Sequence, residues 1–476
     1  MTFRGRLIAP YQREGVTWMA DREMATSGPK GGFLCDEMGL GKTIQLIATM
    51  LVNPKKRTII VVPKSIVTQW KEEINRFAPS LSVYIFDGSD RTKNSKDFEE
   101  FQVVIAPYSV LVNRGKNQGN TVIHELKWSR IILDEGHEIR SLRSKRHISV
   151  ALIKADIRWI VSGTPVYNSM KDFVSLCIFI GLTKSYVQAK TKEIREMYVL
   201  RRTKEDVAKF NQRLALPPCD FQNVEVEMYI EEKRLYESVF QKNKEHLKTL
   251  VRVSTNIGMH QMDILECLLR VRQVMIHPQL YLNGVSTKNG HDPDKWCYES
   301  SKIDTLIKLT KEHPNEKTLI FCQFIEEMNL IQKRLGEVFR IDGSVDKDER
   351  VRQIHEFKNK IGGAFFLIQI KTGGQGLNLQ EATRVYITAP SWNPATEMQA
   401  IARSHRTGQV QKVYVKKLVC NGDAEFPSVE QSIMTLQEHK SMICAEVLND
   451  PRIATQIPVS KKGGMKLGDI LNIFRV

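Results

Sequence analysis

Short, uninterrupted apolar runs recur along the first two hundred positions, with helical stretches between them. They occupy residues 32–35, 58–62, 82–86, 103–105, 130–133 and 159–161. None of them alternates polar and apolar residues, which is typical of strands covered on both faces. Covered strands that are separated by helices predict a parallel α/β sheet.

The pattern changes between about residues 190 and 300 and then returns. Long charged helices are predicted at 184–202, 230–253 and 259–276, and a polar stretch at 283–295 predicts a loop or mobile connection. Further strand-like runs follow at 318–321, 364–368, 384–387 and 413–415. We therefore expect an α/β protein with two parallel-sheet lobes, at 1–195 and 301–440. A helical insertion (196–300) would lie between them, and a short helical tail (441–476) would follow.

Composition limits the class of protein. Of 476 residues, 42% are hydrophobic and 26% charged, which excludes a wholly disordered chain. The apolar runs fall well short of the roughly 18 residues that cross a bilayer, and the N-terminus lacks a secretory signal, so we expect an intracellular protein without a membrane partner. The net charge of +16 favours a polyanionic partner. The eight cysteines form no Cys-x-x-Cys pair, which argues against a zinc ribbon or RING finger.

A glycine-containing turn follows the first predicted strand. The segment Asp36-Glu-Met-Gly-Leu-Gly-Lys-Thr43 leads into an apolar helix. Backbone N–H groups of such a turn can approach phosphate oxygens, and the helix N-terminus adds partial positive charge. Lys42 would reach the β- and γ-phosphates and Thr43 would bind magnesium. Asp36 stands where the strict P-loop pattern has glycine; the alternative is an ordinary turn before a helix.

An acidic pair ends a later strand. Asp134-Glu-Gly-His137 follows the run at 130–133. Phosphoryl transfer to water needs a carboxylate for magnesium, which suits Asp134, and a base that orients the water, which suits Glu135. Such a pair is otherwise more often a solvated loop, and the upstream phosphate loop reverses those odds.

The second lobe carries two arginines of interest. Arg403 and Arg406 are three residues apart in a segment that begins with a helical pattern, so we expect them to share a helix face. Alone they would be surface charges. As partners of a distant phosphate loop they are candidates for arginine fingers.

In their order, these elements resemble the Swi/Snf family of double-stranded-DNA translocases in helicase superfamily two. The resemblance covers almost the whole chain, and the Asp36 departure is itself typical of that family. The segments that carry it include Pro10–Trp18, Asp36–Thr43, Val62–Trp70, Asp134–His137, Ser162–Asn168, Leu200–Lys204, Arg272–Pro278, Phe321–Phe324, Thr372–Asn378, Trp392–Ala395 and Arg403–Gln409.

The resemblance implies ATP and magnesium as cofactors and double-stranded DNA as partner. It gives the catalytic roles to Lys42, Asp134, Glu135, Arg403 and Arg406, and the magnesium to Thr43 and Asp134. The residues implied to bind the nucleotide are Gln12 at the adenine, Asp36, Met38, Gly39, Leu40, Gly41, Lys42, Thr43 and Gly376. The residues implied to contact DNA are Lys64, Ser65, Trp70, Tyr108, Gln323, Thr372 and Trp392.

Within the family, the chain resembles the helicase-like-transcription-factor and post-replication-repair branch. Members of that branch often carry a RING finger, and the missing cysteine pairs predict no ubiquitin-ligase activity here. The resemblance suggests a monomeric motor reduced to its core, as would suit a large DNA virus or a compact genome. We expect it in the nucleus or at a site of viral DNA replication or transcription.

The implied function is a DNA-dependent ATPase that translocates on duplex DNA and remodels chromatin, other DNA-bound proteins or repair intermediates. One alternative is a helicase that separates strands. Another is an ATP-gated scaffold that clamps DNA and barely turns over, although the acidic pair and both arginines argue against it. The sequence leaves the cargo open.

Overall fold

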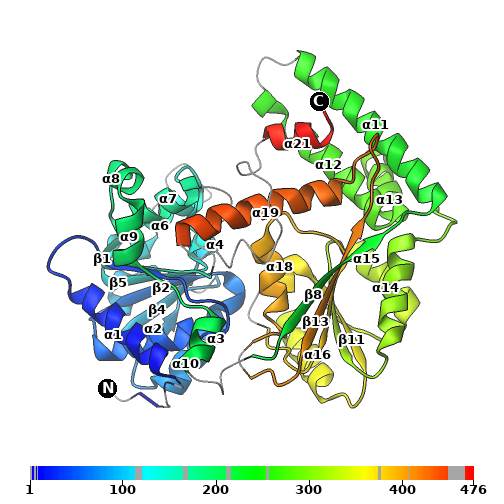
Figure 1. The fold of residues 1–476 in the computed structure, drawn as a ribbon. Coiled ribbons are helices and arrows are strands. Elements are labelled where there is room, and N and C mark those ends of the chain that lie inside the picture. The colour runs from blue at the N-terminus through cyan, green and yellow to red at the C-terminus, as the bar shows by residue number, and fades with distance from the viewer. Residues whose placement is uncertain are drawn as a thin grey trace. The chain divides into compact units, whose positions relative to one another are not determined.

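The computed structural model describes residues 3–4, 7, 9–89, 91–112, 121–163, 170–210, 216–253, 257–373, 377–406, 408–448 and 467–476. The chain divides into two compact units. The first comprises Met1–Leu216 with Met442–Gln456, and the second comprises Pro217–Ser441 with Ile457–Val476. Each unit is built around one sheet (Figure 1).

The first unit holds a seven-stranded sheet of order β3-β4-β2-β5-β6-β1-β7. Every pairing in it is parallel. Its strands are β1 (Lys30–Leu34), β2 (Thr58–Val62), β3 (Val83–Ile85), β4 (Val103–Pro107), β5 (Lys127–Asp134), β6 (Lys154–Val161) and β7 (Val199–Leu200). The helices of this unit are α1 (Pro10–Met24), α2 (Lys42–Val52), η1 (Lys64–Ile66), α3 (Val67–Phe77), η2 (Ser95–Phe98), α4 (Tyr108–Leu111), α5 (Val122–Glu125), η3 (Gly136–Ile139), α6 (Lys145–Ala151), α7 (Met170–Ile180), α8 (Lys184–Ala189), α9 (Thr191–Tyr198) and α10 (Lys204–Phe210).

The central strands contain uninterrupted apolar runs because both faces of the sheet are covered there. Along β5, Ile131 and Leu133 belong to one core cluster and Ile132 to another. Side chains of successive strand residues point to opposite faces, so one apolar run supplies two layers of core. This explains why the strand runs show no polar alternation.

A buried polar cluster fixes α1 against this sheet. The carboxylate of Glu23 accepts hydrogen bonds from Arg130 Nε (2.6 Å), Trp159 Nε1 (2.8 Å) and Asn53 Nδ2 (2.7 Å). Burying this charge is tolerable because each of its oxygens is satisfied. Helix α1 carries Gln12, so the cluster helps to position a predicted nucleotide contact.

The second unit holds a six-stranded sheet of order β10-β11-β9-β12-β13-β8, again with parallel pairings. Its strands are β8 (Cys219–Val226), β9 (Lys317–Cys322), β10 (Phe339–Ile341), β11 (Ala364–Gln369), β12 (Arg384–Ile387) and β13 (Val413–Cys420). Its helices begin with α11 (Ile230–Val253), η5 (Ile257–His260), α12 (Gln261–Ile276), α13 (Pro278–Asn289), α14 (Ser301–Glu312) and α15 (Ile325–Leu335). They continue with α16 (Lys347–Asn359), α17 (Ile370–Gly373), α18 (Pro394–Ile401), α19 (Val429–Leu448) and α21 (Leu467–Ile473). The end of α19, from Met442 on, is assigned to the first unit.

The C-terminal helix α21 packs on α11 and α12 (Figure 1). Phe474 stacks on Phe240 with ring centroids 5.0 Å apart, and both rings are fully buried. A buried aromatic pair of this kind stabilises beyond its buried area. None of the described helices is long and apolar enough to cross a membrane.

The predicted fold class, two parallel-sheet α/β lobes, is confirmed, with some differences in detail. Strand β8 lies inside the predicted helical insertion and joins the second sheet. The helix predicted at 184–202 is instead two helices followed by β7, and the loop predicted at 283–295 begins within α13.

Candidate functional site

Four strands of the first sheet end in register. Asp134 pairs with Val161, Val161 with Leu34 and Leu34 with Leu200. The carboxyl ends of parallel strands meet at one edge of the sheet, which is where open α/β sheets bind ligands. The segments that follow these strands therefore emerge side by side. They are Asp134-Glu135, Ser162-Gly163, the turn from Cys35 to Gly41, and Arg201-Arg202.

The glycine-containing turn ends at the N-terminus of α2. Gly41 caps that helix with a φ of 73°, and a Cβ there would lie 2.7 Å from Nε2 of Gln12, so the position requires glycine. Lys42 Nζ donates to the Asp36 carbonyl (2.8 Å) and lies 3.4 Å from the Glu37 carbonyl. The ammonium group is thus folded over the turn, where a phosphate would be its natural partner.

Asp36 has a structural reason to replace the first glycine of the P-loop pattern. Its fully buried carboxylate accepts hydrogen bonds from Arg202 Nε (3.0 Å), the Arg202 backbone N–H (3.1 Å) and Gln45 Nε2 (3.0 Å). Arg202 also donates to Gln45 Oε1 (2.7 Å) and to the Tyr11 carbonyl. This network fixes the turn from a segment 166 residues away in sequence.

Replacing Arg202 with Met should therefore loosen the turn. Removing one member of a buried ion pair strands the other charge and costs about 3 kcal/mol of unfolding free energy. We expect a lower melting temperature and an ATP affinity at least about tenfold weaker, as measured by thermal denaturation and nucleotide titration. Arg13→Met, at an exposed position of α1, should match wild type in both measurements.

Tyr11 and Gln12 contact the same turn from α1. The Tyr11 hydroxyl donates to the Leu40 carbonyl (3.0 Å), and Gln12 Nε2 lies 3.4 Å from that carbonyl. Gln12 is only 4% exposed. The structure therefore brings Gln12 to the phosphate loop, and its contact with adenine stays a prediction.

The acidic pair follows β5, at the other end of this set of four strand ends. Asp134 is the last residue of β5, and its carboxylate accepts from the backbone N–H of Glu135 (2.9 Å). Glu135 adopts a φ of 48°, a conformation that non-glycine residues rarely adopt and that is strained. Strain of this kind concentrates at functional sites.

Trp70 and Tyr108 support the acidic pair. Trp70 Nε1 donates to Asp134 Oδ2 (2.8 Å), and the Tyr108 hydroxyl donates to the Asp134 carbonyl (2.9 Å). Both side chains are buried, at 2% and 3% exposure. In this structure both side chains hold Asp134, and their predicted contact with DNA stays a prediction.

The sequence motif gives His137 no role of its own, whereas the structure places it in the site. Its Nδ1 lies 3.4 Å from Glu135 Oε2 and 3.4 Å from Ser162 Oγ. Burial, and then the nearby Arg140 charge, lower the pKa of His137 to about 4. The imidazole is therefore neutral at neutral pH and lies between Glu135 and the segment after β6.

Asp134 gives the ligand-free protein a pH dependence. Burial, and then the Glu135 charge, raise the pKa of Asp134 to about 6, while the Trp70 hydrogen bond lowers it. Because the folded pKa exceeds the unfolded one, the contribution of Asp134 to stability is complete below about pH 4 and is lost as pH rises through about 6.

We therefore expect the difference in unfolding free energy between wild type and Asp134→Asn to change across that interval. Trp70→Phe should move the upper end of the interval to higher pH, because the donor that stabilises the carboxylate is gone. Denaturant titrations from pH 4 to 8 measure both effects. A difference that stays flat across the interval would place Asp134 in a different environment.

In the second unit, Arg403 and Arg406 meet at one carbonyl. Arg403 Nη1 lies 3.4 Å, and Arg406 Nη1 3.5 Å, from the Leu377 carbonyl. The expected shared helix face is wrong, because α18 ends at Ile401 and both arginines lie in the turns that follow. Those turns still bring the two guanidinium groups to the same place.

The other residues predicted to contact DNA have the following neighbours in the structure. Lys64 and Ser65 are exposed in η1 after β2, with Lys64 Nζ 3.7 Å from Asp87. Gln323 Nε2 donates to the Ala389 carbonyl (3.0 Å), and Thr372 Oγ1 to Gln369 Oε1 (3.1 Å). The Arg272 guanidinium lies 5.2 Å from the Trp392 ring centroid. Gly376 lies outside the described residues.

Comparison with known families decides the identity of the chain. A model of the SNF2-related domain matches residues 11–191 and 183–280, and a model of the helicase conserved C-terminal domain matches residues 301–408. The chain belongs to the SNF2-related ATPases. The first match contains the phosphate loop and the acidic pair, and the second contains both arginines.

Relatives of this SNF2-related ATPase come from several sources. It is 28% identical to the Probable global transactivator of Orgyia pseudotsugata multicapsid polyhedrosis virus, over 91% of this chain and 90% of that protein. It is 26% identical to the mouse (Mus musculus) Helicase-like transcription factor, over 82% of this chain and 50% of that protein. It is 25% identical to the DNA repair protein RAD5B of Arabidopsis thaliana, over 90% of this chain and 46% of that protein. The chain thus spans about half the length of the latter two relatives.

Among solved structures, the Sulfolobus solfataricus SWI2/SNF2 ATPase core in complex with dsDNA is 28% identical to this SNF2-related ATPase. The match covers 95% of this chain and 96% of that chain, with a TM-score of 0.42.

Proposed function

We propose that the chain is a DNA-dependent ATPase that couples ATP hydrolysis to translocation on double-stranded DNA. The observation that carries the proposal is the register of β5, β6 and β1, which end at the same level in the first sheet. It places the phosphate loop, the acidic pair and the Ser162-Gly163 segment at adjacent strand ends. Membership in the family supports the class of reaction. The residues at these strand ends are the ones that would perform it.

The residues of the loop fit a triphosphate. A Cβ would not fit at Gly41, and Gly39 also has a positive φ of 91°, so the backbone between Met38 and Gly41 is shaped for close approach. Lys42 Nζ already donates to loop carbonyls, and phosphate oxygens would replace them as acceptors. Asp36 acts indirectly, by holding the turn through Arg202.

Thr43 and Asp134 would hold magnesium. The Lys42 charge lowers the pKa of Asp134, so the ammonium group and the carboxylate interact electrostatically. When bound, the ion neutralises charge on the phosphates. Trp70 and the Glu135 backbone N–H occupy Asp134 oxygens and fix the orientation of the carboxylate. Glu135 would accept the proton of the attacking water.

The proposal gives Arg403 and Arg406 the task of completing the site in the nucleotide-bound state. Their convergence on the Leu377 carbonyl supports it, because two guanidinium groups held at one point can serve one phosphate.

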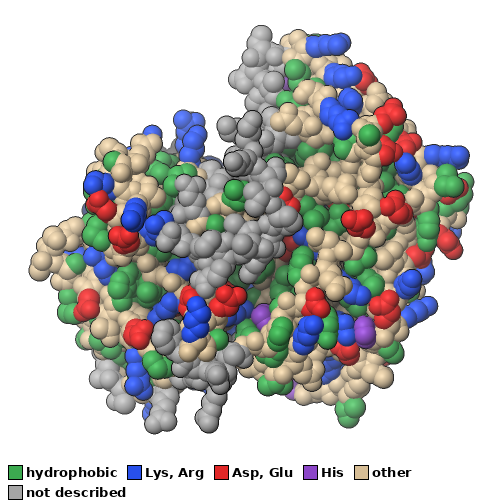
Figure 2. All heavy atoms as spheres, in the orientation of Figure 1, with side chains coloured by type: hydrophobic (Ala, Val, Ile, Leu, Met, Phe, Trp, Pro, Cys, Tyr) green, Lys and Arg blue, Asp and Glu red, His purple; other side chains and the backbone are tan. Residues whose placement is uncertain are grey.

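The assignment of duplex DNA rests on charge and on exposed polar residues. The chain carries a net charge of +16, and the exposed Lys64 and Ser65 follow β2 at the same edge of the sheet. On the face drawn in Figure 2, Lys and Arg side chains are interspersed with Asp and Glu. Gln323, Thr372 and Trp392 are the proposed contacts of the second unit, and remodelling of DNA-bound proteins is the proposed outcome.

ATP hydrolysis with different nucleic acids tests this function. We expect duplex DNA to stimulate hydrolysis more than single-stranded DNA, and stimulation to weaken as salt rises because phosphate contacts release counterions. Forked DNA and nucleosomes in the same assay would identify the cargo. Robust displacement of a strand from forked DNA would exclude a translocase that leaves the strands paired. A rate of ATP hydrolysis that stays very low with and without duplex DNA would support the scaffold alternative.

A further inference from the structure

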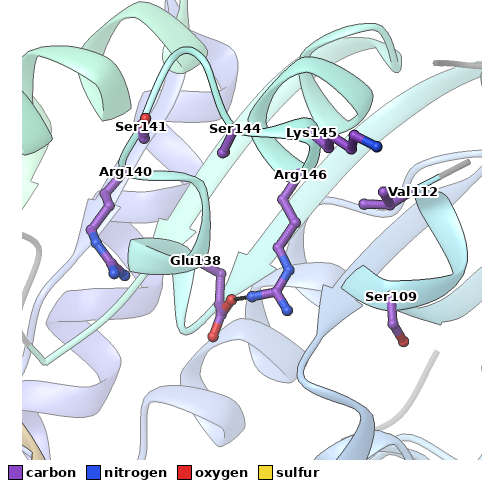
Figure 3. Close-up of a pocket in the computed structure, with 8 residues that line it drawn as sticks. All are labelled: Ser109, Val112, Glu138, Arg140, Ser141, Ser144, Lys145 and Arg146. Atoms are coloured by element: carbon purple, nitrogen blue, oxygen red, sulfur yellow. Dashed lines mark hydrogen bonds and ion pairs between the residues drawn. The ribbon is translucent and has the colours of Figure 1, made fainter. Parts of the chain in front are cut away.

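The first unit contains a pocket of about 520 Å³, lined by segments that follow β4 and β5 (Figure 3). Two of its cations are engaged within the fold: Arg146 pairs with Glu138, and Arg140 donates to the His137 carbonyl (3.3 Å). The pocket thus gives no evidence of a ligand. An exposed apolar surface in the second unit gives stronger evidence of a partner.

Helix α12 of the second unit has two apolar sides. One side lies in the core of the unit, where Ile264 and Leu268 are buried. Met262, Leu265 and Leu269 are three and four positions apart, so they lie along the opposite side of the helix. These three side chains are 76%, 39% and 38% exposed. A surface helix normally has one apolar stripe, which faces the core, so a second and exposed one is typical of an interaction site.

The exposed side continues into η5, where Met259 is 80% exposed. We call Met259, Met262, Leu265 and Leu269 the apolar stripe. At about 1.5 Å per residue it is about 15 Å long, or nearly three helical turns. Two of its four side chains are methionines, which adapt readily to the shape of a partner.

The shape of the stripe favours a helical partner. The side of a helix offers side chains and no open backbone groups, so a strand laid on it would leave its own backbone groups unpaired. A helix satisfies its backbone internally and can present apolar residues at positions i, i+3 or i+4, and i+7. This is the same spacing that the stripe itself has.

Charged side chains next to the stripe on α12 are close to balance. Glu266 accepts hydrogen bonds from Lys288 Nζ (2.9 Å) and from Arg270 Nη2 (3.3 Å). Asp263 lies 3.3 Å from His260 Nδ1. The charge of the surroundings therefore depends on the neighbouring helix.

Helix α11 packs on both η5 and α12 and makes the surroundings positive. Residues 241–253, at the end that leads into η5, contain Lys242, Lys244, Lys248 and Arg252 but only one carboxylate, Glu245. Acidic side chains on a partner would complement this excess. A second copy of the same surface would bring like charges together, which disfavours self-association.

We propose that the apolar stripe docks an amphipathic helix of a partner protein, and that acidic side chains border the apolar face of that helix. None of the four stripe residues is a proposed nucleotide or DNA contact. The inference therefore adds an interaction surface to the proposed function and does not depend on it.

Two labelled peptides test the chemistry of the partner. Each has about 20 residues, because shorter isolated helices are marginal in water, and each carries leucines at i, i+3 and i+7. One has glutamates beside the leucines, and the other has lysines at the same positions. By fluorescence anisotropy with the full chain, we expect the acidic peptide to bind at least about tenfold more tightly at low salt, and the difference to narrow as salt rises.

Variants of the stripe test the place of binding. Met262→Ser and Leu269→Ser should each weaken binding of the acidic peptide about tenfold, because each removes a buried apolar contact from the complex. Ile361→Ser makes a similar change at a residue that is 97% exposed elsewhere in the unit, and should match wild type. Thermal denaturation and ATP hydrolysis should stay at wild-type values in all three variants.

A pair of charge reversals on α11 tests the role of its cations. Arg252→Glu, at the end next to η5, should reduce the preference for the acidic peptide over the lysine peptide about threefold. Arg234→Glu makes the same change at an exposed position about 27 Å earlier along the helix and should leave that preference at its wild-type value.

Three results would overturn the inference: no binding of either peptide, binding of the lysine peptide as tight as that of the acidic one, or stripe variants that bind like Ile361→Ser. Sedimentation that shows a wild-type dimer, separated by Met262→Ser, would assign the stripe to a second copy of the chain and overturn it as well. Wild-type protein without DNA-stimulated hydrolysis would refute the proposed function and leave these binding results unaffected.

Discussion

Glu135→Gln should lower the maximal rate of ATP hydrolysis by at least about 100-fold, because glutamine cannot accept the proton of the attacking water. The substitution keeps the size of the side chain and an acceptor near His137, so the strained backbone at this position should persist. ATP and duplex DNA should bind with near wild-type affinity. Phosphate-release kinetics and nucleotide titration measure the two effects separately.

Two companion variants sharpen that result. Glu125→Gln makes the same change at an exposed position after β4 and should hydrolyse ATP at the wild-type rate. Lys42→Ala should also abolish hydrolysis, but through weakened ATP binding, while duplex binding is retained. Near-normal DNA-stimulated hydrolysis by Glu135→Gln would mean that a different residue is the base.

The strands whose bounds match the predicted runs most exactly are those buried on both faces. The runs at 58–62 and 384–387 coincide with β2 and β12, because a central parallel strand has no polar face to interrupt its pattern. Strands β7 and β10 contain only two and three residues and give no recognisable run. Strand β8 lies at the edge of its sheet and keeps polar residues on exposed positions, so its pattern falls below that of a buried strand.

The site residues also differ in how far the sequence alone predicts their roles. The phosphate loop and the acidic pair are contiguous in sequence, and the strand register brings them to one edge of the sheet. The role of Asp36 depends on Arg202, which no local pattern connects to it. The burial of Trp70 and Tyr108 against Asp134 is likewise a property of the packed sheet. A tryptophan or tyrosine in a motif is compatible with either a surface contact or a positioning role.

The second large effect concerns the two arginines. Arg403→Ala and Arg406→Ala should each lower the maximal rate of ATP hydrolysis by about 1,000-fold, because an arginine finger stabilises charge that develops in the transition state. ATP affinity should change by less than about threefold, since the loop and Lys42 provide ground-state binding. Arg352→Ala removes an exposed arginine of the same unit and should match wild type.

The central claim is that guanidinium groups of the second unit complete the site in which the first unit holds the nucleotide. Comparing the turnover number with the ATP affinity of these variants tests that claim most directly. The measurement is the turnover number for ATP at saturating ATP and duplex DNA, with the ATP dissociation constant measured on the same preparations. We predict turnover reduced by about 1,000-fold with the dissociation constant nearly unchanged. Wild-type turnover in both variants would contradict the account.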